Sequence, residues 1–256
     1  MRRGAKLGQH FLNSQWVARD LVKSVGIRDE EPVLEIGPGK GALTKELLAQ
    51  GARVIAIEKD PALIPMLRST FETEIAHGTL TVIEGDVRDF SPEKFGADTY
   101  AIAANIPYYI TGEILRHFLS SMRQPRAMAL LIQKEVAQRI IARDGKESIL
   151  SLSVKAYGTP SIVAKVPRGS FNPPPAVDSA ILLIQDISRD FFRDISEEDF
   201  FKVVRAGFAS KRKLLSSNLK TLFENPLEIF ERCGIPAKTR AEDLKLEQWK
   251  RLVEGL

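Results

Sequence analysis

Short, continuously apolar runs that alternate with helix-like segments constrain the fold of this chain more than any other feature. Strands with nearly every position apolar are typical of parallel sheets covered on both faces. Such strands alternating with helices, joined by right-handed crossovers, predict a doubly wound, mostly parallel α/β sheet. The predicted strands are Pro32–Ile36, Arg53–Glu58, Leu80–Glu84, Tyr100–Ala104 and Ala127–Gln133, and the predicted helices are Ala42–Gln50, Pro61–Phe71 and Glu113–Ser121.

The end of the predicted sheet differs from its beginning. Two further strands are expected at about Leu152–Tyr157 and Ser179–Ile184, with the Pro-rich stretch "VPRGSFNPPPAVDS" close before the second. We find no good helix between them, so the sheet is predicted to end with an antiparallel pair.

The chain becomes helical in character after Asp186. Ser196 and Asp199 form a capping-box pattern at the start of an amphipathic stretch, and Asn225-Pro226 interrupts the helical pattern further on. We therefore predict a larger α/β domain over residues 1–187 and a small all-helical domain over residues 188–256.

Basic residues gather in two places on a chain whose net charge is only +4. Residues 1–28 hold six basic residues, among them Arg2, Arg3 and Lys6, and one acidic residue. Residues 202–213 hold five basic residues and no acidic one. Concentrated positive charge on a nearly balanced chain predicts a polyanionic partner.

Several classes of protein are disfavoured by composition. The single cysteine, Cys233, excludes an internal disulfide, and the three histidines lie far apart in the sequence, so no metal site is predicted. We find no stretch of 18 apolar residues and no apolar core of a signal peptide near the N-terminus. A cytoplasmic protein that spans no membrane is expected.

A glycine-rich turn follows the first predicted strand, in "VLEIGPGKGALT" (residues 33–44). Gly37, Gly39 and Gly41 allow a tight turn with the backbone close to a ligand at the start of a helix. The turn also fits the looser dinucleotide pattern G-x-G-x-x-G/A. From this loop alone, a nicotinamide cofactor therefore stays an alternative.

Acidic residues follow the next two predicted strands. Glu58 ends the second strand, where a carboxylate can accept both hydroxyls of a ribose. Asp86 follows the third strand and suits either a hydrogen bond from an adenine amine or a helix N-cap. Dinucleotide and S-adenosylmethionine sites share this arrangement, but we find no histidine or Tyr-x-x-x-Lys placed for hydride transfer.

The fourth predicted strand ends in "NIPY" (105–108). The Asn105 side-chain oxygen and a carbonyl next to Pro107 would give two acceptors for the two N–H bonds of an adenine amine. Accepting both aims the nitrogen lone pair at a methyl donor, while the face of Tyr108 stacks on the base. No strong general base is needed, and positioning carries the catalysis.

These motifs, in this order, resemble the small-subunit rRNA adenine N6-dimethyltransferase family. "NIPY" is similar to the (N/D)PP(Y/F) signature of amino-methyltransferases. The resemblance covers residues 6 to about 186, with a weaker echo in "FASKRKLLSSNL" (208–219). The motifs that carry it are "GQHFL" (8–12), "EIGPGKGALT" (35–44), "IEKD" (57–60), "GDVRD" (85–89), "NIPYYIT" (105–111), "LLIQKEVAQRI" (130–140) and "FNPPPAVDSA" (171–180).

The resemblance implies a seven-stranded, Rossmann-like class I methyltransferase sheet and S-adenosylmethionine as cofactor. Gly37 would lie at the amino-acid end of the cofactor, Glu58 at its ribose and Asp86 at its adenine. Family members often have asparagine at position 10, where a histidine still offers a donor or acceptor. The implied cofactor-binding residues are His10, Leu12, Gly37, Gly39, Glu58, Asp86 and Asn105.

The resemblance also implies which residues meet the RNA. Asn105 and Pro107 would face the target amine, Tyr108 would stack on the target base, and Phe171 would close the opposite face. Tyr109 stands where many relatives have asparagine or glutamine, and its role stays open. Phosphates would be bound by the basic residues, including Lys211, Arg212 and Lys213.

The implied activity is dimethylation of N6 of two adjacent adenosines in the 3′-terminal hairpin of small-subunit rRNA during ribosome assembly. The partner would be small-subunit rRNA within a pre-30S-like particle, and the protein would act as a monomer without a metal. Two alternatives stay open: a large-subunit rRNA adenine N6-methyltransferase, and a ribosome-assembly binding factor with dispensable methylation.

Overall fold

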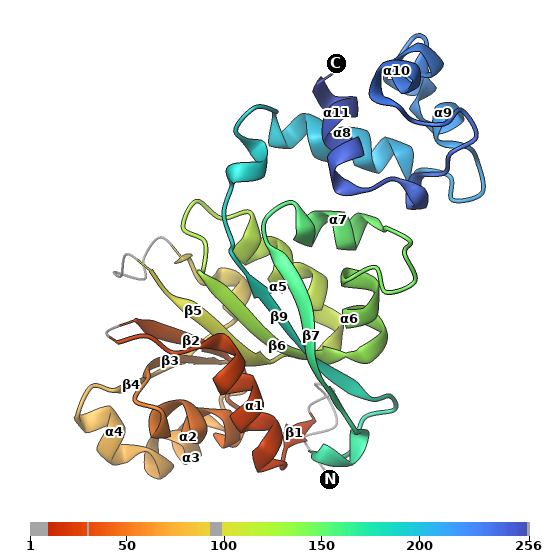
Figure 1. The fold of residues 1–256 in the computed structure, drawn as a ribbon. Coiled ribbons are helices and arrows are strands. Elements are labelled where there is room, and N and C mark those ends of the chain that lie inside the picture. Colours follow the sequence, from red (N-terminus) through yellow and green to blue (C-terminus); the bar gives the residue numbers. More distant parts are fainter. Residues whose placement is uncertain (1–9, 30, 93–98, 255–256) are drawn as a thin grey trace. The chain divides into compact units, whose positions relative to one another are not determined.

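The computed structural model describes residues 10–29, 31–92 and 99–254, which divide into two compact units. One unit holds the chain up to Ala137 together with Pro160–Ile187, and the other holds Gln138–Thr159 together with the chain from Ser188 onward. Residues 138–159 thus cluster with the C-terminal helices, although the sequence predicts them in the first domain. Figure 1 labels the elements of both units.

The first unit is built on a seven-stranded sheet with the order β4-β3-β2-β5-β6-β9-β7. Its strands are β2 (Pro32–Ile36), β3 (Arg53–Glu58), β4 (Leu80–Glu84), β5 (Ala101–Asn105), β6 (Ala127–Gln133), β7 (Thr159–Val166) and β9 (Ser179–Gln185). Strands β2 to β6 pair in parallel, whereas β9 runs antiparallel to β6. The predicted mostly parallel α/β sheet is therefore confirmed.

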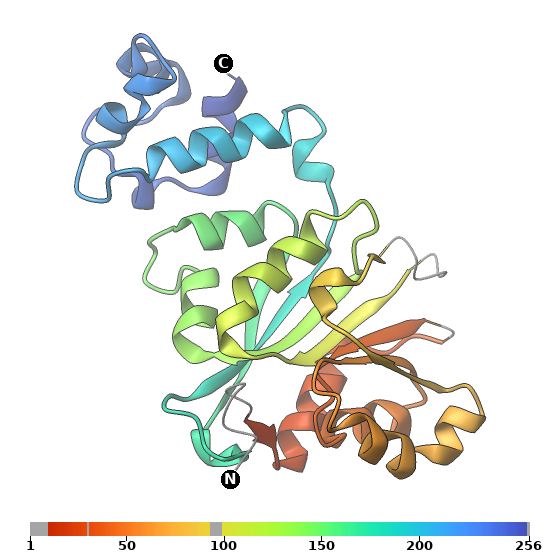
Figure 2. The same cartoon turned by 180° about the vertical axis from the view of Figure 1, so that it is seen from behind.

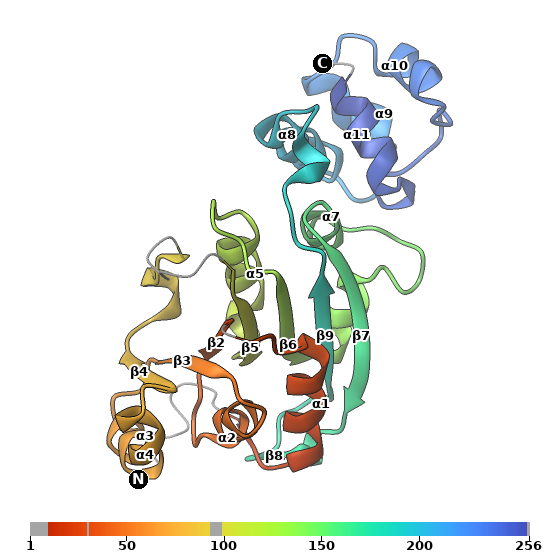
Figure 3. The same cartoon turned by 60° about the vertical axis from the view of Figure 1, so that its left-hand side comes forward.

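Helices cover both faces of this sheet. They are α1 (Gln15–Val25), α2 (Ala42–Ala49), α3 (Ile64–Thr70), α4 (Glu72–Ala76) and α5 (Thr111–Leu119). Helix α1 lies on one side of β5 and β6 and α5 on the other (Figure 3). Helix α1 is not among the predicted helices, although Val17, Leu21 and Val25 recur at helical spacing and are buried in the core of this unit.

One predicted strand is wrong. The segment near Leu152–Tyr157 forms helix α7 (Ile149–Lys155), and the edge strand β7 follows at Thr159–Val166. Leu152 and Val154 alternate as in a strand, but the Ser148 hydroxyl accepts from the Ser151 N–H in a capping box that starts the helix. Leu152 and Ala156, four residues apart, then enter the helical core of the second unit.

The second unit is otherwise helical, with α8 (Glu197–Gly207), α9 (Leu215–Asn218), α10 (Pro226–Cys233) and α11 (Leu246–Glu254) (Figure 2). Helix α6 (Lys134–Ile140) spans the division between the units. The predicted cap at Ser196 is present, because its hydroxyl accepts from the Asp199 N–H at 3.2 Å. Trp249 is fully buried in the core of this unit and stacks on Phe208.

Candidate active site

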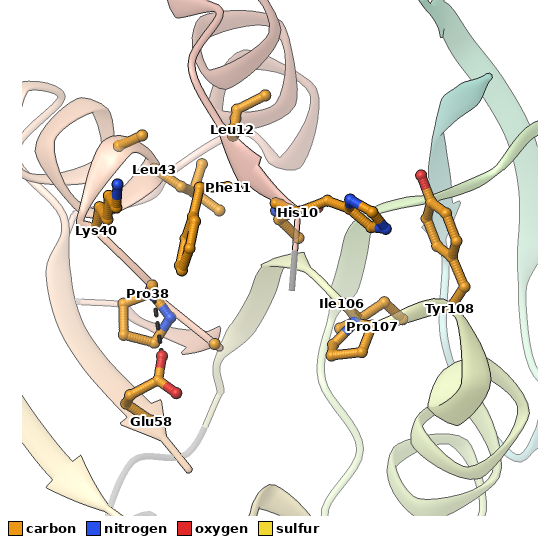
Figure 4. A pocket seen from close by; sticks show the side chains of 14 residues that line it. His10, Phe11, Leu12, Pro38, Lys40, Leu43, Glu58, Ile106, Pro107 and Tyr108 are labelled. Carbon is orange, nitrogen blue, oxygen red and sulfur yellow. Dashed lines mark hydrogen bonds between the residues drawn. The ribbon is translucent and has the colours of Figure 1, made fainter. Parts of the chain in front are cut away.

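The functional residues predicted from the strand ends lie at one edge of the sheet. Parallel strands end on the same side, so β2, β3, β4 and β5 deliver their following residues to a common edge. Two pockets lie there. The first is lined by His10, Phe11, Leu12, Gly37, Pro38, Gly39, Lys40, Ala42, Leu43, Glu58, Asn105, Ile106, Pro107 and Tyr108 (Figure 4).

The glycine loop is tied to Glu58. The Gly39 N–H donates to Glu58 Oε2 at 3.0 Å, and the Asp60 N–H donates to Oε1 at 2.8 Å. Glu58 is only 4% exposed, and Figure 4 shows its carboxylate beside Pro38. Each carboxylate oxygen has a further lone pair, so the group can still accept hydrogen bonds from a ligand in the pocket.

The close packing of Gly41 can be tested by comparing it with Gly51, a glycine of similar φ in an open position. The φ of Gly41 is +83°, and a Cβ there would lie 2.5 Å from Cε2 of Phe71. Gly51 has a similar φ of +79° with nothing within 4 Å. We expect Gly51→Ala to lower the free energy of unfolding by about 1–2 kcal/mol through backbone strain alone, and Gly41→Ala by roughly 1–3 kcal/mol more through overpacking. Urea unfolding measures both, and equal losses would contradict this account.

Asp86 lies in the second pocket, which Lys59, Arg88 and Tyr109 also line. Its Oδ1 accepts from the Arg88 N–H and from Arg88 Nε, both at 3.0 Å, and Arg88 Nη2 and Lys59 Nζ lie 2.6 and 2.8 Å from Oδ2. Of the two roles that the sequence leaves open for Asp86, the helix N-cap is therefore present. Hydrogen bonds from Arg88 hold the pKa of Asp86 well below its usual range. Tyr109 is 65% exposed, so its ring lies at the rim of this second pocket and not in the core.

The Asn105 side chain has a defined orientation. Its Nδ2 donates to the His10 carbonyl at 3.1 Å. Because a carbonyl can only accept, the amide nitrogen faces His10, and Oδ1 points away from that carbonyl as an acceptor. His10 is held in turn by a 2.8 Å contact between its Nδ1 and the Pro173 carbonyl.

Tyr108 is half-buried at the rim of the same pocket. Its hydroxyl lies 2.6 Å from the Ser179 hydroxyl, which is fully buried in β9. Burial raises the pKa of Tyr108, and the carboxylates of Asp178 and Glu135 raise it further. The phenol therefore stays neutral near pH 7, and the hydrogen bond fixes the direction of its ring.

Other predicted site residues lie outside this pocket. Phe171 is 3% exposed and belongs to the core of the first unit, opposite Leu12 in the short β1–β8 pair (Phe11–Leu12 and Phe171–Asn172). The basic run 211–213 lies in the second unit, exposed in the turn between α8 and α9. Arg2, Arg3 and Lys6 lie outside the described residues. The roles assigned to Phe171 and to these basic residues stay predictions.

Sequence reasoning missed several residues of the site. Phe11 and Lys40 line the first pocket, with Lys40 Nζ 4.9 Å from the centre of the Phe11 ring. Ser179, 71 residues further along the chain, holds the Tyr108 side chain through a hydrogen bond between the two hydroxyls. Lys40 lies within the glycine motif and could have been noted, whereas no local signal marks Ser179 as a partner of Tyr108.

Glu35 is a fully buried acid beneath the glycine loop. Its Oε2 accepts from the Thr44 hydroxyl at 2.7 Å, and its Oε1 has no hydrogen-bond partner in the part of the chain that the structure describes. Burial raises the pKa of Glu35 to about 8, and the nearby Glu58 carboxylate adds to the increase. The folded protein therefore holds this proton at neutral pH.

A pH dependence of stability follows from Glu35. Unfolded, the carboxyl ionises near pH 4.5, whereas folded it ionises near pH 8. Its contribution is present below pH 4.5 and is lost as the pH rises towards 8, by at most about 1.4 kcal/mol per pH unit. The Glu35→Gln variant does not titrate, so its stability relative to the wild type should rise over this range in urea unfolding. If the stabilities of the two proteins changed with pH in parallel, Glu35 would not have a raised pKa in the folded protein.

Within residues 10–29, 31–92 and 99–254, no group of three or more His, Cys, Asp or Glu side chains is placed to hold a metal ion. None of the helices described there is long and apolar enough to cross a membrane.

The comparisons with known proteins identify the family. The sequence profile described as ribosomal RNA adenine dimethylase matches residues 2–256. The chain belongs to this family. It is therefore a methyltransferase and not the dehydrogenase that the glycine loop alone leaves open. The implied enzyme class and the resemblance to rRNA adenine dimethyltransferases are confirmed.

Individual relatives cover nearly the whole chain. A ribosomal RNA small subunit methyltransferase A from Dehalococcoides mccartyi is 42% identical over 96% of this chain and 86% of its own length. A protein of the same name from Thermosynechococcus vestitus is 37% identical over 100% of this chain and 97% of its own length.

Solved structures show the same fold. A dimethyladenosine transferase from Plasmodium falciparum superposes with a TM-score of 0.82 at 27% identity, covering 96% of this chain and 97% of that one. The 23S rRNA methyltransferase ErmE superposes with a TM-score of 0.79 at 27% identity, covering 95% and 98%. The predicted class I methyltransferase fold is confirmed by these neighbours.

Proposed function

We propose that this protein uses S-adenosylmethionine to dimethylate N6 of two adjacent adenosines in the 3′-terminal hairpin of small-subunit rRNA. The observation that carries the proposal is the orientation of Asn105, whose amide oxygen is left as an acceptor in a pocket that Glu58 and Tyr108 also line. The relatives at 37–42% identity are named small-subunit enzymes. The large-subunit enzyme ErmE, at 27%, is more distant in sequence and represents the alternative substrate.

The residues that line the two pockets include carboxylates and a glycine loop of the kind that bind S-adenosylmethionine. A Cβ on Gly39 would lie 3.1 Å from the Phe11 ring, so the loop has no room for a side chain there. Glu58 offers acceptors for the two ribose hydroxyls. Asp86 lies in the second pocket, but both of its oxygens already accept from Arg88 and Lys59, so an adenine amine would have to displace one of these contacts. When bound, S-adenosylmethionine supplies a methyl group activated by a sulfonium.

The residues of the chain would then position the target amine. Asn105 Oδ1 and a carbonyl next to Pro107 accept its two N–H bonds and direct the nitrogen lone pair. Tyr108 stacks on the base, which contributes about 1–3 kcal/mol in single-strand binders. The amine becomes acidic as its new N–C bond forms and loses a proton to water. Catalysis rests on position and electrostatics rather than on a general base.

We assign the helical region 188–256 to RNA binding, with a pre-30S-like particle as partner, the monomer as the active form and the cytoplasm as the compartment. The exposed residues Lys211, Arg212 and Lys213 suit phosphates, since basic groups on a turn bind the RNA backbone without reading its sequence. Specificity would come from RNA shape and from the extruded base.

Replacing Lys211, Arg212 and Lys213 together with alanine should weaken binding of the substrate particle and flatten its salt dependence. The slope of log K against log salt is expected to fall by roughly 2–3, close to one for each lost phosphate contact. Filter binding at several salt concentrations measures this slope. The affinity for S-adenosylmethionine serves as the internal control and should not change. An unchanged slope would show that Lys211, Arg212 and Lys213 do not contact the phosphates of the RNA.

The function itself is tested with labelled S-adenosylmethionine. Small and large ribosomal subunits from cells lacking the modification are incubated with the protein, and the labelled nucleotides are mapped. We expect label at two adjacent adenosines near the 3′ end of small-subunit rRNA. Label confined to large-subunit rRNA would support the alternative substrate, and no label in either subunit would favour a binding factor.

A further inference from the structure

We infer that the Arg88 side chain blocks Asp86 in the free protein and moves to Glu113 when S-adenosylmethionine binds. This inference rests on the proposed function, because it takes the second pocket to hold the adenine of the cofactor. Asp86 and Arg88 both line that pocket, and Glu113 lies in the first turn of α5. Arg88 is thus a positioning residue that acts through Asp86 and lowers the affinity for the cofactor.

The Asp86 carboxylate has no free acceptor site in this structure. A carboxylate offers about four lone-pair sites, two on each oxygen. Oδ1 accepts from the backbone N–H and from Nε of Arg88, both at 3.0 Å. Oδ2 accepts from Arg88 Nη2 at 2.6 Å and lies 2.8 Å from Lys59 Nζ. A further donor, such as the exocyclic amine of adenine, can bind only where one of these contacts opens.

The Arg88 side chain is the contact that opens. The backbone N–H of Arg88 belongs to the cap of the short helix Val87–Asp89 and is fixed by it. Within the described residues, Lys59 has no carboxylate other than Asp86 at ion-pair distance. The Arg88 guanidinium does have a second one, because its Nη1 already lies 3.4 Å from Glu113 Oε2. A rotation of the side chain therefore exchanges one carboxylate for the other and keeps the charge paired.

Solvent exposure makes this exchange small in free energy. The side chains of Arg88 and Glu113 are 45% and 57% exposed, whereas that of Asp86 is 16% exposed. Exposed ion pairs are weak, because water screens them and because long side chains lose freedom when they pair. The free protein therefore exchanges between a closed and an open form, and the apparent Kd of the cofactor rises as the open fraction falls.

The rest of the second pocket suits a flat ring once the guanidinium has moved. Apolar side chains of Ile57, Val87 and Ile110 line it. In such pockets the apolar lining holds the ring system, and the few polar groups determine which ring is accepted. A released Asp86 carboxylate favours adenine, whose exocyclic amine donates, over hypoxanthine, which has an oxygen at that position.

Removing the guanidinium should raise the affinity for the cofactor. We expect Arg88→Leu to lower the Kd of S-adenosylhomocysteine about 2–10-fold in calorimetry, the range that an exposed ion pair allows. KM for S-adenosylmethionine should fall by the same factor with kcat unchanged, because Arg88 no longer contacts Asp86 once the cofactor is bound. The matched control is Arg116→Leu, since Arg116 is exposed on α5 and lines neither pocket.

Glu113→Gln should have the opposite effect. Without this acid the guanidinium has no second carboxylate to pair with, so the Kd of S-adenosylhomocysteine should rise about 2–5-fold. In the double variant Arg88→Leu/Glu113→Gln, the Kd should equal that of Arg88→Leu, because Glu113 acts only through Arg88. Circular dichroism and urea unfolding check that each variant is folded.

A second ligand reports on the amine contact itself. S-inosylhomocysteine has an oxygen in place of the exocyclic amine, so it cannot donate to Asp86. Its Kd should not fall in Arg88→Leu. The preference for S-adenosylhomocysteine over S-inosylhomocysteine should therefore widen about 2–10-fold in this variant.

Three results would overturn the inference. The first is an unchanged or higher Kd of S-adenosylhomocysteine in folded Arg88→Leu. The second is an equal gain for the adenosyl and inosyl ligands, because the effect would then come from net charge rather than from Asp86. The third is additivity of the Arg88 and Glu113 substitutions. Absence of methylation by a wild type that shows the expected affinity changes would instead contradict the proposed function alone.

Discussion

Asn105→Ala is expected to lower kcat by about 10²–10³-fold, the loss seen when one preorganised hydrogen-bonding group is removed from an active site. The Oδ1 atom is the acceptor that directs the target amine, and the methyl group of alanine cannot replace it. Single-turnover methylation of the substrate particle measures the change. Binding of the particle should persist, because phosphate contacts rather than Asn105 dominate it.

Asn105→Asp tests the orientation of the amide. Aspartate keeps an acceptor, but it cannot donate to the His10 carbonyl, which now lies 3.1 Å from Nδ2. The carboxylate would be repelled by that carbonyl and turn, so we expect a loss of rate close to that of alanine. Asn13→Ala is the matched control, since Asn13 is exposed and lines neither pocket. Wild-type rates in Asn105→Asp would show that the donor half of the amide is unimportant.

Glu58→Gln is expected to weaken the binding of S-adenosylmethionine by 100-fold or more. Both carboxylate oxygens accept from backbone N–H groups, of Gly39 and Asp60. A glutamine must turn its NH₂ towards one of them, which disrupts the loop. It also loses charge-assisted hydrogen bonds to the ribose, each of about 1.5–3 kcal/mol. Isothermal titration calorimetry with S-adenosylmethionine and S-adenosylhomocysteine measures the loss.

Glu84→Gln is the matched control for Glu58. Glu84 is the residue opposite Glu58 in the register of β3 and β4, but it is exposed and lines neither pocket. Its substitution should leave the cofactor affinity unchanged. If both variants lost affinity equally, the effect would come from the net charge at this edge rather than from the Glu58 carboxylate.

Local sequence patterns predicted most strands of the sheet well and the edge formed by β7 poorly. Strands β2, β3 and β4 have the predicted bounds, because each is an apolar run bounded by polar or turn residues. The same reasoning failed at α7, where Leu152 and Val154 alternate as in a strand. This segment is a helix because Ser148 caps it and because Leu152 and Ala156 lie four residues apart on one face. That face is buried by helices that are distant in the sequence.

The sequence by itself determined which residues gather at the edge of the sheet. Because parallel strands end on the same side, the glycine loop, Glu58, Asp86 and Asn105 could be placed together from strand order alone. Only the tertiary structure decided the pairs that complete the site. His10 and Asn105 are 95 residues apart and Tyr108 and Ser179 are 71 apart. Such contacts depend on how segments distant in the sequence fold back to the strand ends. Local sequence patterns carry no information about which of these segments meet there.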